Sequence, residues 1–281
     1  RCGDPGWPIS VGFLPGRARD ELAALLHDAG IPVMGAIGPD VDLEAVPRIR
    51  RARLNVAMPG THAQTLLDGI REVTGIPGRV PPSPFGRDGC RAWLRDVASA
   101  MGREEAAMEA FARCEAALAD RLEGTRRRAG AVPVLVALRI EDLGFLDEAR
   151  SLGVPLVPML AGMGFPVTVL VSGRDGQATR LVQAVRQVRA RPGIEGTGVR
   201  VASTEGSAGL QQALRDGSHL LAFSDLQGDW RLLEHGIQTF SLRDLEPGLQ
   251  GQVRSSDRLA ERAANPFFRR YRKHLERGVK T

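Results

Sequence analysis

The sequence has few cysteines, few aromatic residues and no long apolar run. Its three cysteines, Cys2, Cys90 and Cys114, are scattered, and none belongs to a Cys-x-x-Cys pair. This usage excludes a disulfide framework and is typical of a reducing compartment, so we expect a cytoplasmic protein. The longest apolar runs, such as Val132 to Leu138, have the length of strands and fall far short of the roughly 20 residues that a membrane helix requires. The sequence therefore predicts no membrane span.

Stacking residues are also scarce, although the chain is basic. Aromatic residues make up 5% of the 281 residues, with a single tyrosine, and the formal net charge is +5. The excess positive charge lies at 126–128, 186–191 and 269–273, which are expected helix ends and solvated faces. A nucleic-acid surface interleaves basic side chains with stacking groups. Because this chain lacks that interleaving, we expect no nucleic-acid partner.

Nucleotide fingerprints, metal-ligand spacings and a signal peptide are missing as well. The run Gly35-Ala36-Ile37-Gly38 follows an expected strand but lacks the third glycine of a dinucleotide turn, and there is no P-loop. The five histidines lie on different expected elements without an i, i+4 partner. We therefore expect no metal ion, ATP or NAD on this chain alone. The chain opens on Arg1 instead of methionine, which indicates a processed or cut end.

The most informative stretch runs from Leu54 to Met101. It predicts a buried strand to Met58, a Pro59-Gly60 turn, and a helix that Gly75 ends, with Ala63, Leu66, Leu67, Ile70 and Val73 on its inner face. A proline-rich crossing and a Pro84-Phe85-Gly86 bend then lead to a second helix, with Asp88 as the expected N-cap and Trp93, Leu94, Val97 and Met101 inward. Two helix N-termini would thus project from one sheet edge, where open α/β sheets bind ligands.

The rest of the chain repeats this alternation of strands and helices, which predicts parallel pairing with right-handed crossovers. The expected fold class is α/β: two Rossmann-like, doubly wound parallel-sheet lobes joined by a long helix, with a C-terminal helical tail. The expected domains are a first lobe at 1–102, a connecting helix at 103–130, a second lobe at 131–250 and a tail at 251–281. We expect strands at 9–14, 31–37, 132–138, 166–172, 199–202, 219–223 and 237–240, and helices at 17–29, 103–128, 141–161 (broken near Pro155), 177–190, 207–216 and 230–235, with a short partly helical connection at 40–51.

Single residues at the two sheet edges are the candidate site. His62 lies in the first turn of a helix at the expected ligand edge. Phe85, on a glycine-bounded loop, is the kind of aromatic that contacts a ligand or partner. Cys90 lies in a first helical turn, where the helix dipole would lower the pKa of a thiol, although a small buried packing residue is the alternative interpretation. Asp225 marks the second lobe's edge and fits turn chemistry equally well.

The order of several elements resembles a known family. Pro84, Phe85, Gly86, Gly89, Trp93 and Leu94 match a Pro-Phe-Gly-x-x-Gly-Thr-x-x-Trp-Leu loop and helix, in which Cys90 replaces the threonine. With the preceding strands and helices, this run resembles the middle domain of the nitrogenase component 1 superfamily. The closest resemblance is to the N subunit of light-independent protochlorophyllide reductase. It covers roughly the first hundred residues well, and Leu160 to Met163 and the strand before Gly236 resemble later elements of the family.

The resemblance implies a subunit or fragment of a nitrogenase-like oxidoreductase that reduces a tetrapyrrole double bond, in bacteriochlorophyll biosynthesis for this subfamily. Electrons would come from an ATP-dependent iron–sulfur reductase through an iron–sulfur cluster shared with a second component-1-type subunit. This chain would supply substrate-binding walls, with His62 as a candidate proton donor. The implied substrate-binding residues are Met58, Thr61, Pro84, Phe85, Gly86, Cys90 and Asp225.

Departures from the family set limits on this expectation. No counterpart of the cluster-binding N-terminal domain is present, and Cys2 alone cannot replace three cysteine ligands. The stretches around Leu67 and Arg243 offer neither the cysteine nor the histidine that hold the large metal cluster in nitrogenase itself. We therefore expect no cofactor on this chain alone. Three alternatives stay open: a non-catalytic cofactor-assembly scaffold of the same superfamily, a two-lobe small-molecule binding protein, and a two-lobe glycosyltransferase.

Overall fold

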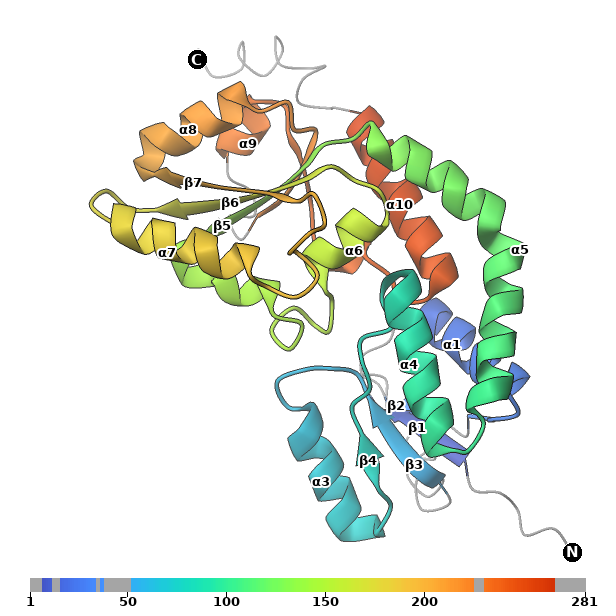
Figure 1. The fold of residues 1–281 in the computed structure, drawn as a ribbon. Coiled ribbons are helices and arrows are strands. Elements are labelled where there is room, and N and C mark those ends of the chain that lie inside the picture. Colours follow the sequence, from blue (N-terminus) through green and yellow to red (C-terminus); the bar gives the residue numbers. More distant parts are fainter. Residues whose placement is uncertain (1–6, 12–15, 34–35, 38–51, 225–229, 266–281) are drawn as a thin grey trace, which may run out of the picture. The chain divides into compact units, whose positions relative to one another are not determined.

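A computed structural model describes residues 7–11, 16–33, 36–37, 52–224 and 230–265. The chain forms two compact units (Figure 1). The first unit comprises Arg1–Asp120, Glu148–Pro155 and Glu246–Gln252, and the second comprises Arg121–Asp147, Leu156–Leu245 and Val253–Thr281. The expected connection at 40–51 and the tail beyond 265 lie outside the described residues. None of the described helices combines the length and the apolar character that a membrane span requires.

The first unit is built on a parallel sheet with the strand order β2-β1-β3-β4. Its strands are β1 (Trp7–Val11), β2 (Ala36–Ile37), β3 (Ala52–Ala57) and β4 (Gly78–Arg79), and its helices are α1 (Gly16–Asp28), α3 (Ala63–Thr74) and α4 (Gly86–Ala100). Helices α1 and α4 pack together, and α3 packs on β3 and β4. Strand β3 is buried at five of its six positions, including the polar Asn55, as expected of a strand inside a parallel sheet.

Helix α3 ends at Gly75 as predicted, because this residue adopts φ 72° and its N–H bonds to the carbonyl of Arg71. Its inner face is narrower than the periodicity predicts. Only Leu67 is fully buried, while Leu66 and Val73 are 48% and 74% exposed. The close contact with β4 depends on Gly78, since a Cβ there would lie 2.6 Å from the Cβ of Leu67. One leucine inserted against a glycine therefore fixes the helix on its strand.

Helix α4 buries Trp93, Leu94 and Val97, which the sequence placed on its inner side. The prediction of Asp88 as its N-cap was wrong. Phe85 holds the N-cap position, in an extended conformation, and Asp88 lies in the first turn. The difference has little energetic cost, because a carboxylate anywhere in the first turn interacts favourably with the positive end of the helix dipole.

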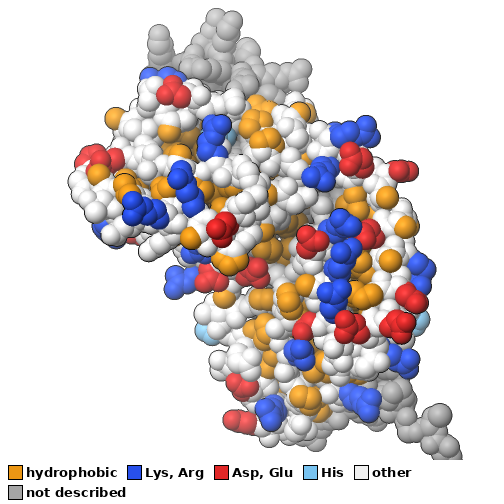
Figure 2. All heavy atoms as spheres, viewed as in Figure 1, with side chains coloured by type: hydrophobic (Ala, Val, Ile, Leu, Met, Phe, Trp, Pro, Cys, Tyr) orange, Lys and Arg blue, Asp and Glu red, His pale blue; other side chains and the backbone are white. Residues whose placement is uncertain are grey.

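Helix α5 (Glu104–Gly130) is the long amphipathic helix that the sequence predicts, and the boundary between the two units falls within it. Phe111 is buried under Arg91, whose guanidinium carbon lies 5.1 Å from the ring centroid. Glu115 accepts hydrogen bonds from Arg87 and Arg91 of α4. Figure 2 shows such basic and acidic side chains interspersed over the face that carries α4 and α5, which is the pattern of a solvated surface.

The second unit is built on a five-stranded parallel sheet with the order β7-β6-β5-β8-β9. Its strands are β5 (Val134–Arg139), β6 (Val167–Gly173), β7 (Arg200–Glu205), β8 (Leu221–Ser224) and β9 (Gln238–Phe240), with helices α6 (Leu156–Gly162), α7 (Ala178–Arg189), α8 (Gly206–Asp216) and α9 (Trp230–Glu234). From the central strand β5, the chain adds β6 and β7 on one side and then β8 and β9 on the other. The predicted fold class, two doubly wound parallel α/β lobes, is therefore confirmed.

The helix predicted at 141–161 is broken near Pro155 as expected, but the part before the break is not α-helical. The 3-10 helix η2 (Ile140–Leu146) and α6 occupy its two ends, and the residues between them form turns. Gly153 adopts φ 78° and Pro155 lacks a backbone donor, so a continuous helix is excluded here. The intervening residues 148–155 belong to the first unit, although both neighbouring segments belong to the second.

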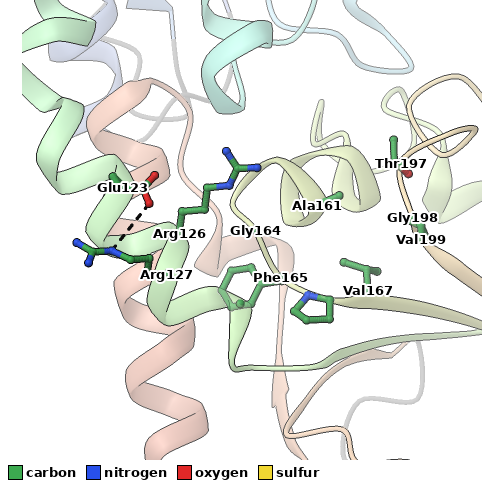
Figure 3. A pocket seen from close by; sticks show the side chains of 12 residues that line it. Glu123, Arg126, Arg127, Ala161, Gly164, Phe165, Val167, Thr197, Gly198 and Val199 are labelled. Atoms are coloured by element: carbon green, nitrogen blue, oxygen red, sulfur yellow. Dashed lines mark ion pairs between the residues drawn. The ribbon is translucent and has the colours of Figure 1, made fainter.

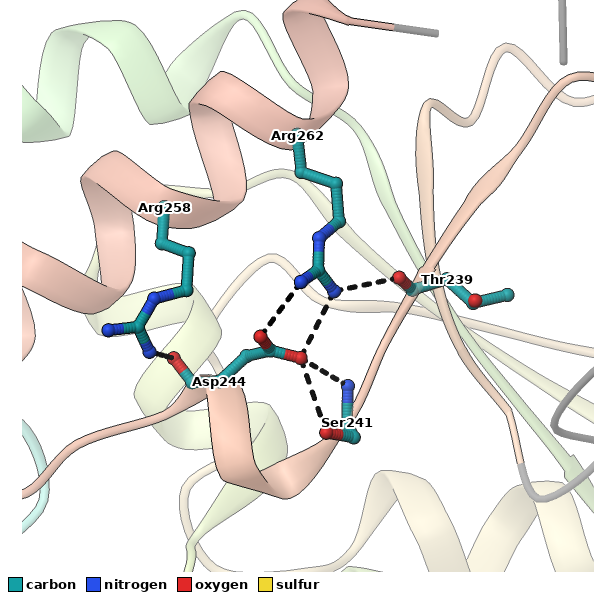
Figure 4. A network of polar contacts seen from close by, with 5 residues as sticks. All are labelled: Thr239, Ser241, Asp244, Arg258 and Arg262. Atoms are coloured by element: carbon teal, nitrogen blue, oxygen red, sulfur yellow. Dashed lines mark hydrogen bonds and ion pairs between the residues drawn. The ribbon is translucent and has the colours of Figure 1, made fainter. Parts of the chain in front are cut away.

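A polar network fixes the start of the predicted tail. Helix α10 (Leu249–Ala264) places Arg262 over the 3-10 helix η3 (Leu242–Asp244), where its two terminal nitrogens lie 2.9 and 3.1 Å from the carboxylate oxygens of Asp244 (Figure 4). The same arginine donates to the carbonyl of Thr239 at 2.9 Å. Asp244 also accepts from the hydroxyl of Ser241 and from its backbone N–H, and the contact with the N–H is one half of a capping box. This network ties α10 to the edge strand β9.

Candidate functional site

The predicted first-unit residues meet at the carboxyl end of β3. The strand ends at Ala57, and the loop from Met58 to His62 leads into α3. His62 is the N-cap residue, and its side chain is exposed and makes no capping hydrogen bond. The hydroxyl of Thr61 donates to the carbonyl of Ala149 at 3.0 Å. The edge predicted to bind a ligand is therefore in contact with residues 148–155.

Gly153 is the centre of that contact. A Cβ at Gly153 would lie 3.0 Å from the carbonyl oxygen of Pro59 and 3.5 Å from the Cε of Met58. The hydroxyl of Ser83 donates to the carbonyl of Gly153. Leu152 beside it has φ 56° and is 70% exposed. A non-glycine residue in the left-handed region is held there only by its surroundings, and the contacts of Gly153 supply that constraint.

The Pro84-Phe85-Gly86 bend is packed inside the first unit, which corrects the expectation of an exposed aromatic. Phe85 is 7% exposed and forms a parallel bridge with Gly248, whose N–H donates to the carbonyl of Pro84 at 2.8 Å. A Cβ at Gly89 would lie 2.4 Å from the carbonyl oxygen of Ser83. Segments far apart in the sequence thus lock the bend, and the Phe85 side chain is not presented to a ligand.

Cys90 is fully buried, so the interpretation as a small packing residue is confirmed and the interpretation as a thiol of lowered pKa was wrong. Burial raises the pKa of Cys90 far above its ordinary value, and the negative charge of Glu21 and the neighbouring Cys114 raise it further. Loss of hydration outweighs the helix dipole here, because a buried thiolate has no solvent to stabilise it. The thiol therefore stays protonated and acts as a small packing residue. Asp225, the remaining predicted residue, lies outside the described residues.

A second group of side chains, not foreseen from the sequence, lines a pocket of about 310 Å³ at the carboxyl edge of the five-stranded sheet. We call it the arginine pocket. Its charged members are Arg139, Arg174, Arg231, Glu141 and Asp175; the other lining residues are Ser172, Gly173, Gly206, Ser207 and Leu210. Three guanidinium groups from three separate elements are suited to binding an anionic group. The sequence did hold one signal for this group: Arg139 is the last residue of β5, and Arg174 directly follows the last residue of β6.

A larger pocket, of about 580 Å³, lies at the opposite edge of the same sheet. Arg126 reaches into it from α5, whereas Arg127 turns toward Glu123, with 3.9 Å between Arg127 Nε and Glu123 Oε1 (Figure 3). Helix α5 ends at this pocket with Gly130, and Ala161 in the last turn of α6 also lines it. The partial negative charge of helix C-termini accounts for basic residues here without a ligand.

Comparison with known proteins identifies the family of this chain. The model of the nitrogenase component 1 type oxidoreductases matches residues 9–196, two thirds of the chain. The chain belongs to this family. Among solved structures, "Nitrogenase Cp1 at pH 5" has a TM-score of 0.64 and 16% identity. The alignment covers 95% of this chain and 59% of the nitrogenase chain. "Nitrogenase Cp1 at pH 6.5" has a TM-score of 0.63 and 15% identity, and the alignment covers 95% of this chain and 60% of the nitrogenase chain. At these identities the likeness shows the fold. No curated protein sequence matches the chain.

This component-1-type chain spans about 59% of the length of the nitrogenase chain that it matches. Relatives of this family carry metal clusters and assemble with a reductase component, so a fit to a cluster can be tested on the residues present. Within the described ranges, no group of three His, Cys, Asp or Glu side chains could hold a metal ion. Cys90 is buried and protonated, and burial also raises the pKa of Cys114. The described residues therefore do not fit a resident cluster.

Proposed function

We propose that this chain is a substrate-binding subunit, or a piece of one, in the catalytic component of a nitrogenase-like reductase. The substrate would be a tetrapyrrole, reduced at a carbon–carbon double bond. Electrons would come from an ATP-dependent iron–sulfur reductase, through a cluster held mainly by a second component-1-type subunit. The family match over residues 9–196 carries this proposal. The Pro84 to Leu94 motif favours the tetrapyrrole reductases within the family.

The packing revises which predicted residues would contact the substrate. Met58, Thr61 and His62 retain partly or fully exposed side chains at the carboxyl end of β3. Pro84, Phe85 and Cys90 are buried, so their role is to hold the bend, and Gly86 permits it through φ 73°. We infer that His62 is the proton donor, because it is the one exposed imidazole on this loop and a histidine can donate a proton near neutral pH.

The test is reconstitution with partners. The chain would be co-expressed with a second component-1-type subunit and an ATP-dependent iron–sulfur reductase from the same genome. Reduction of protochlorophyllide would be followed by absorbance with ATP and dithionite present. We expect turnover that falls by roughly 100-fold or more in His62→Gln, with little change in substrate affinity, as for loss of a general acid. The exposed His27 of α1 supplies the control, His27→Gln, which should leave turnover unchanged.

An assembly scaffold is the second candidate. It is favoured by the burial of Phe85 and Cys90, two residues that were expected to contact a substrate. A scaffold would form a stable complex with component-1-type proteins and transfer a cluster or precursor without reducing any substrate. A complex that assembles, contains iron and shows no turnover would support this role over the enzyme. A chain that binds neither partner would contradict both proposals.

A further inference from the structure

Two exposed leucines of the first unit adjoin the loop that carries His62. Among the described residues, the exposed large hydrophobic side chains are Leu66, Val73, Leu152 and Val182. Leu66 follows His62 by one turn of α3, so both side chains lie on the same side of this helix. Leu152 belongs to the segment 148–155, which contacts the loop where Thr61 donates to the carbonyl of Ala149. Apolar surface is therefore exposed on two sides of one loop.

Leu152 has a strained backbone conformation and adds nothing to the core. Within the described ranges it is the one non-glycine residue with positive φ, at 56°. This region is unfavourable for leucine, because the Cβ crowds a neighbouring carbonyl oxygen. Its neighbours Ser151, Gly153 and Val154 are buried, whereas the Leu152 side chain is exposed to solvent. The strain lowers stability and no burial of the side chain compensates for it, so folding alone does not explain a leucine here.

The turn that carries Leu152 is anchored directly after this residue. The N–H of Gly153 donates to the carbonyl of Glu148 at 2.8 Å, and the carbonyl of Gly153 accepts from the hydroxyl of Ser83. A Cβ at Gly153 would lie 3.5 Å from the Cε of Met58, at the carboxyl end of β3. Leu152 thus projects from a fixed backbone, and little conformational entropy is lost when a ligand covers it.

On the basis of the proposed reductase function, we propose that Leu66 and Leu152 form the apolar wall of the substrate site around His62. Both are then specificity-determining residues for the same reaction. Sites for small organic molecules are lined mainly by apolar side chains, with a few polar groups that fix orientation. The two leucines and the partly exposed Met58 supply the apolar contact area, and His62 supplies the polar group. The wall favours a substrate with an apolar ring system over a hydrophilic one.

The reconstituted complex separates substrate contact from proton donation. Initial rates of protochlorophyllide reduction are measured over a range of substrate concentrations. Leu152→Asn removes the apolar surface while asparagine tolerates positive φ, and Leu66→Gln preserves helix propensity. Each variant should raise KM by roughly fivefold to tenfold and leave kcat within about twofold, as for loss of an apolar contact that is equal in the ground state and the transition state. His62→Gln should show the opposite split, with kcat lowered and KM little changed.

Val182→Gln supplies the control, because it removes an exposed apolar side chain from α7 of the second unit and should change neither constant. An active complex in which both leucine variants keep the wild-type KM would overturn the wall and leave the proposed function standing. A wild-type complex without turnover would refute the proposed function, and the wall with it. Leucine variants that no longer assemble with the second subunit would place these side chains in a subunit interface, which also overturns the wall.

A measurement on the purified full chain tests the role of Leu152 without partners. Leu152→Gly relieves the strained conformation, because glycine adopts positive φ without steric cost. We expect the melting temperature to rise by about 2 °C, since the relieved strain exceeds the added backbone entropy of glycine in the unfolded chain. The same variant should raise KM in the complex at least as much as Leu152→Asn does. A melting temperature that falls by several degrees would show that Leu152 stabilises the fold, and would contradict its assignment to substrate contact.

Discussion

Arg262 binds Asp244 with both of its terminal nitrogens, at 2.9 and 3.1 Å, and joins α10 to the chain that leaves β9. Both side chains are largely shielded from solvent. Paired, partly buried charges contribute more than exposed ones, because removal of one partner leaves the other without compensation. The tail helix is therefore held by a specific polar contact in addition to its apolar face.

We predict that Arg262→Ala lowers the free energy of unfolding by about 2 kcal/mol, since Asp244 and the carbonyl of Thr239 both lose a donor. The control is Arg113→Ala, which removes an exposed i, i+4 pair with Glu109 at 4.0 Å and should cost less than about 0.5 kcal/mol. Urea denaturation followed by circular dichroism measures both. Similar losses of unfolding free energy in the two variants would show that the Arg262–Asp244 pair stabilises the chain no more than an exposed ion pair does.

The closure of residues 148–155 over the end of β3 gives a second prediction. Gly153→Ala should destabilise the chain by about 2 to 3 kcal/mol, because the methyl group would lie 3.0 Å from the carbonyl of Pro59 and φ is 78°. Gly75→Ala also replaces a glycine of positive φ, but nothing lies within 4 Å of its Cβ, so it should cost about 1 kcal/mol. Thermal unfolding compares them. Equal shifts in melting temperature would rule out steric closure at Gly153.

Local signals accounted for most of the fold. The helix α3, its end at Gly75 and the buried run of β5 depend on neighbours in sequence, and all were predicted correctly. The burial of Phe85 was missed because it depends on Gly248, more than 160 residues away in the chain. The arginine pocket was missed for the same reason, since Arg139, Arg174 and Arg231 become neighbours only through strand order. Long-range pairing decides which side chains reach a site.

The cysteines yield a chemical prediction. In the native chain at pH 8, a water-soluble maleimide should modify Cys114, which is partly exposed, at least tenfold faster than the buried Cys90. The pKa of both thiols is raised, so both react slowly, but only Cys90 also lacks access to solvent. Peptide mass spectrometry after timed quenching locates the label. In urea the two rates should converge, and a native Cys90 that reacts as fast as Cys114 would disprove its assignment as a packing residue.

The last prediction concerns pH. Burial, and then the positive charge of Arg200, lower the pKa of His219 in the folded chain below its ordinary value of 6.5. Below pH 6.5 the unfolded chain therefore binds a proton that the folded chain does not, so stability must fall as the pH falls through this range. Above pH 6.5 the imidazole is neutral in both states and has no effect.

His219→Gln should remove this component of the pH dependence, and the difference in unfolding free energy between wild type and variant should change as the pH is lowered from 7.5 to 5. His27 is exposed on α1, so His27→Gln supplies a control that removes an imidazole from outside the buried environment of His219. Urea denaturation at four pH values measures all three chains. Parallel curves for wild type and His219→Gln would show that His219 titrates alike in the folded and unfolded states, against the burial that the structure shows.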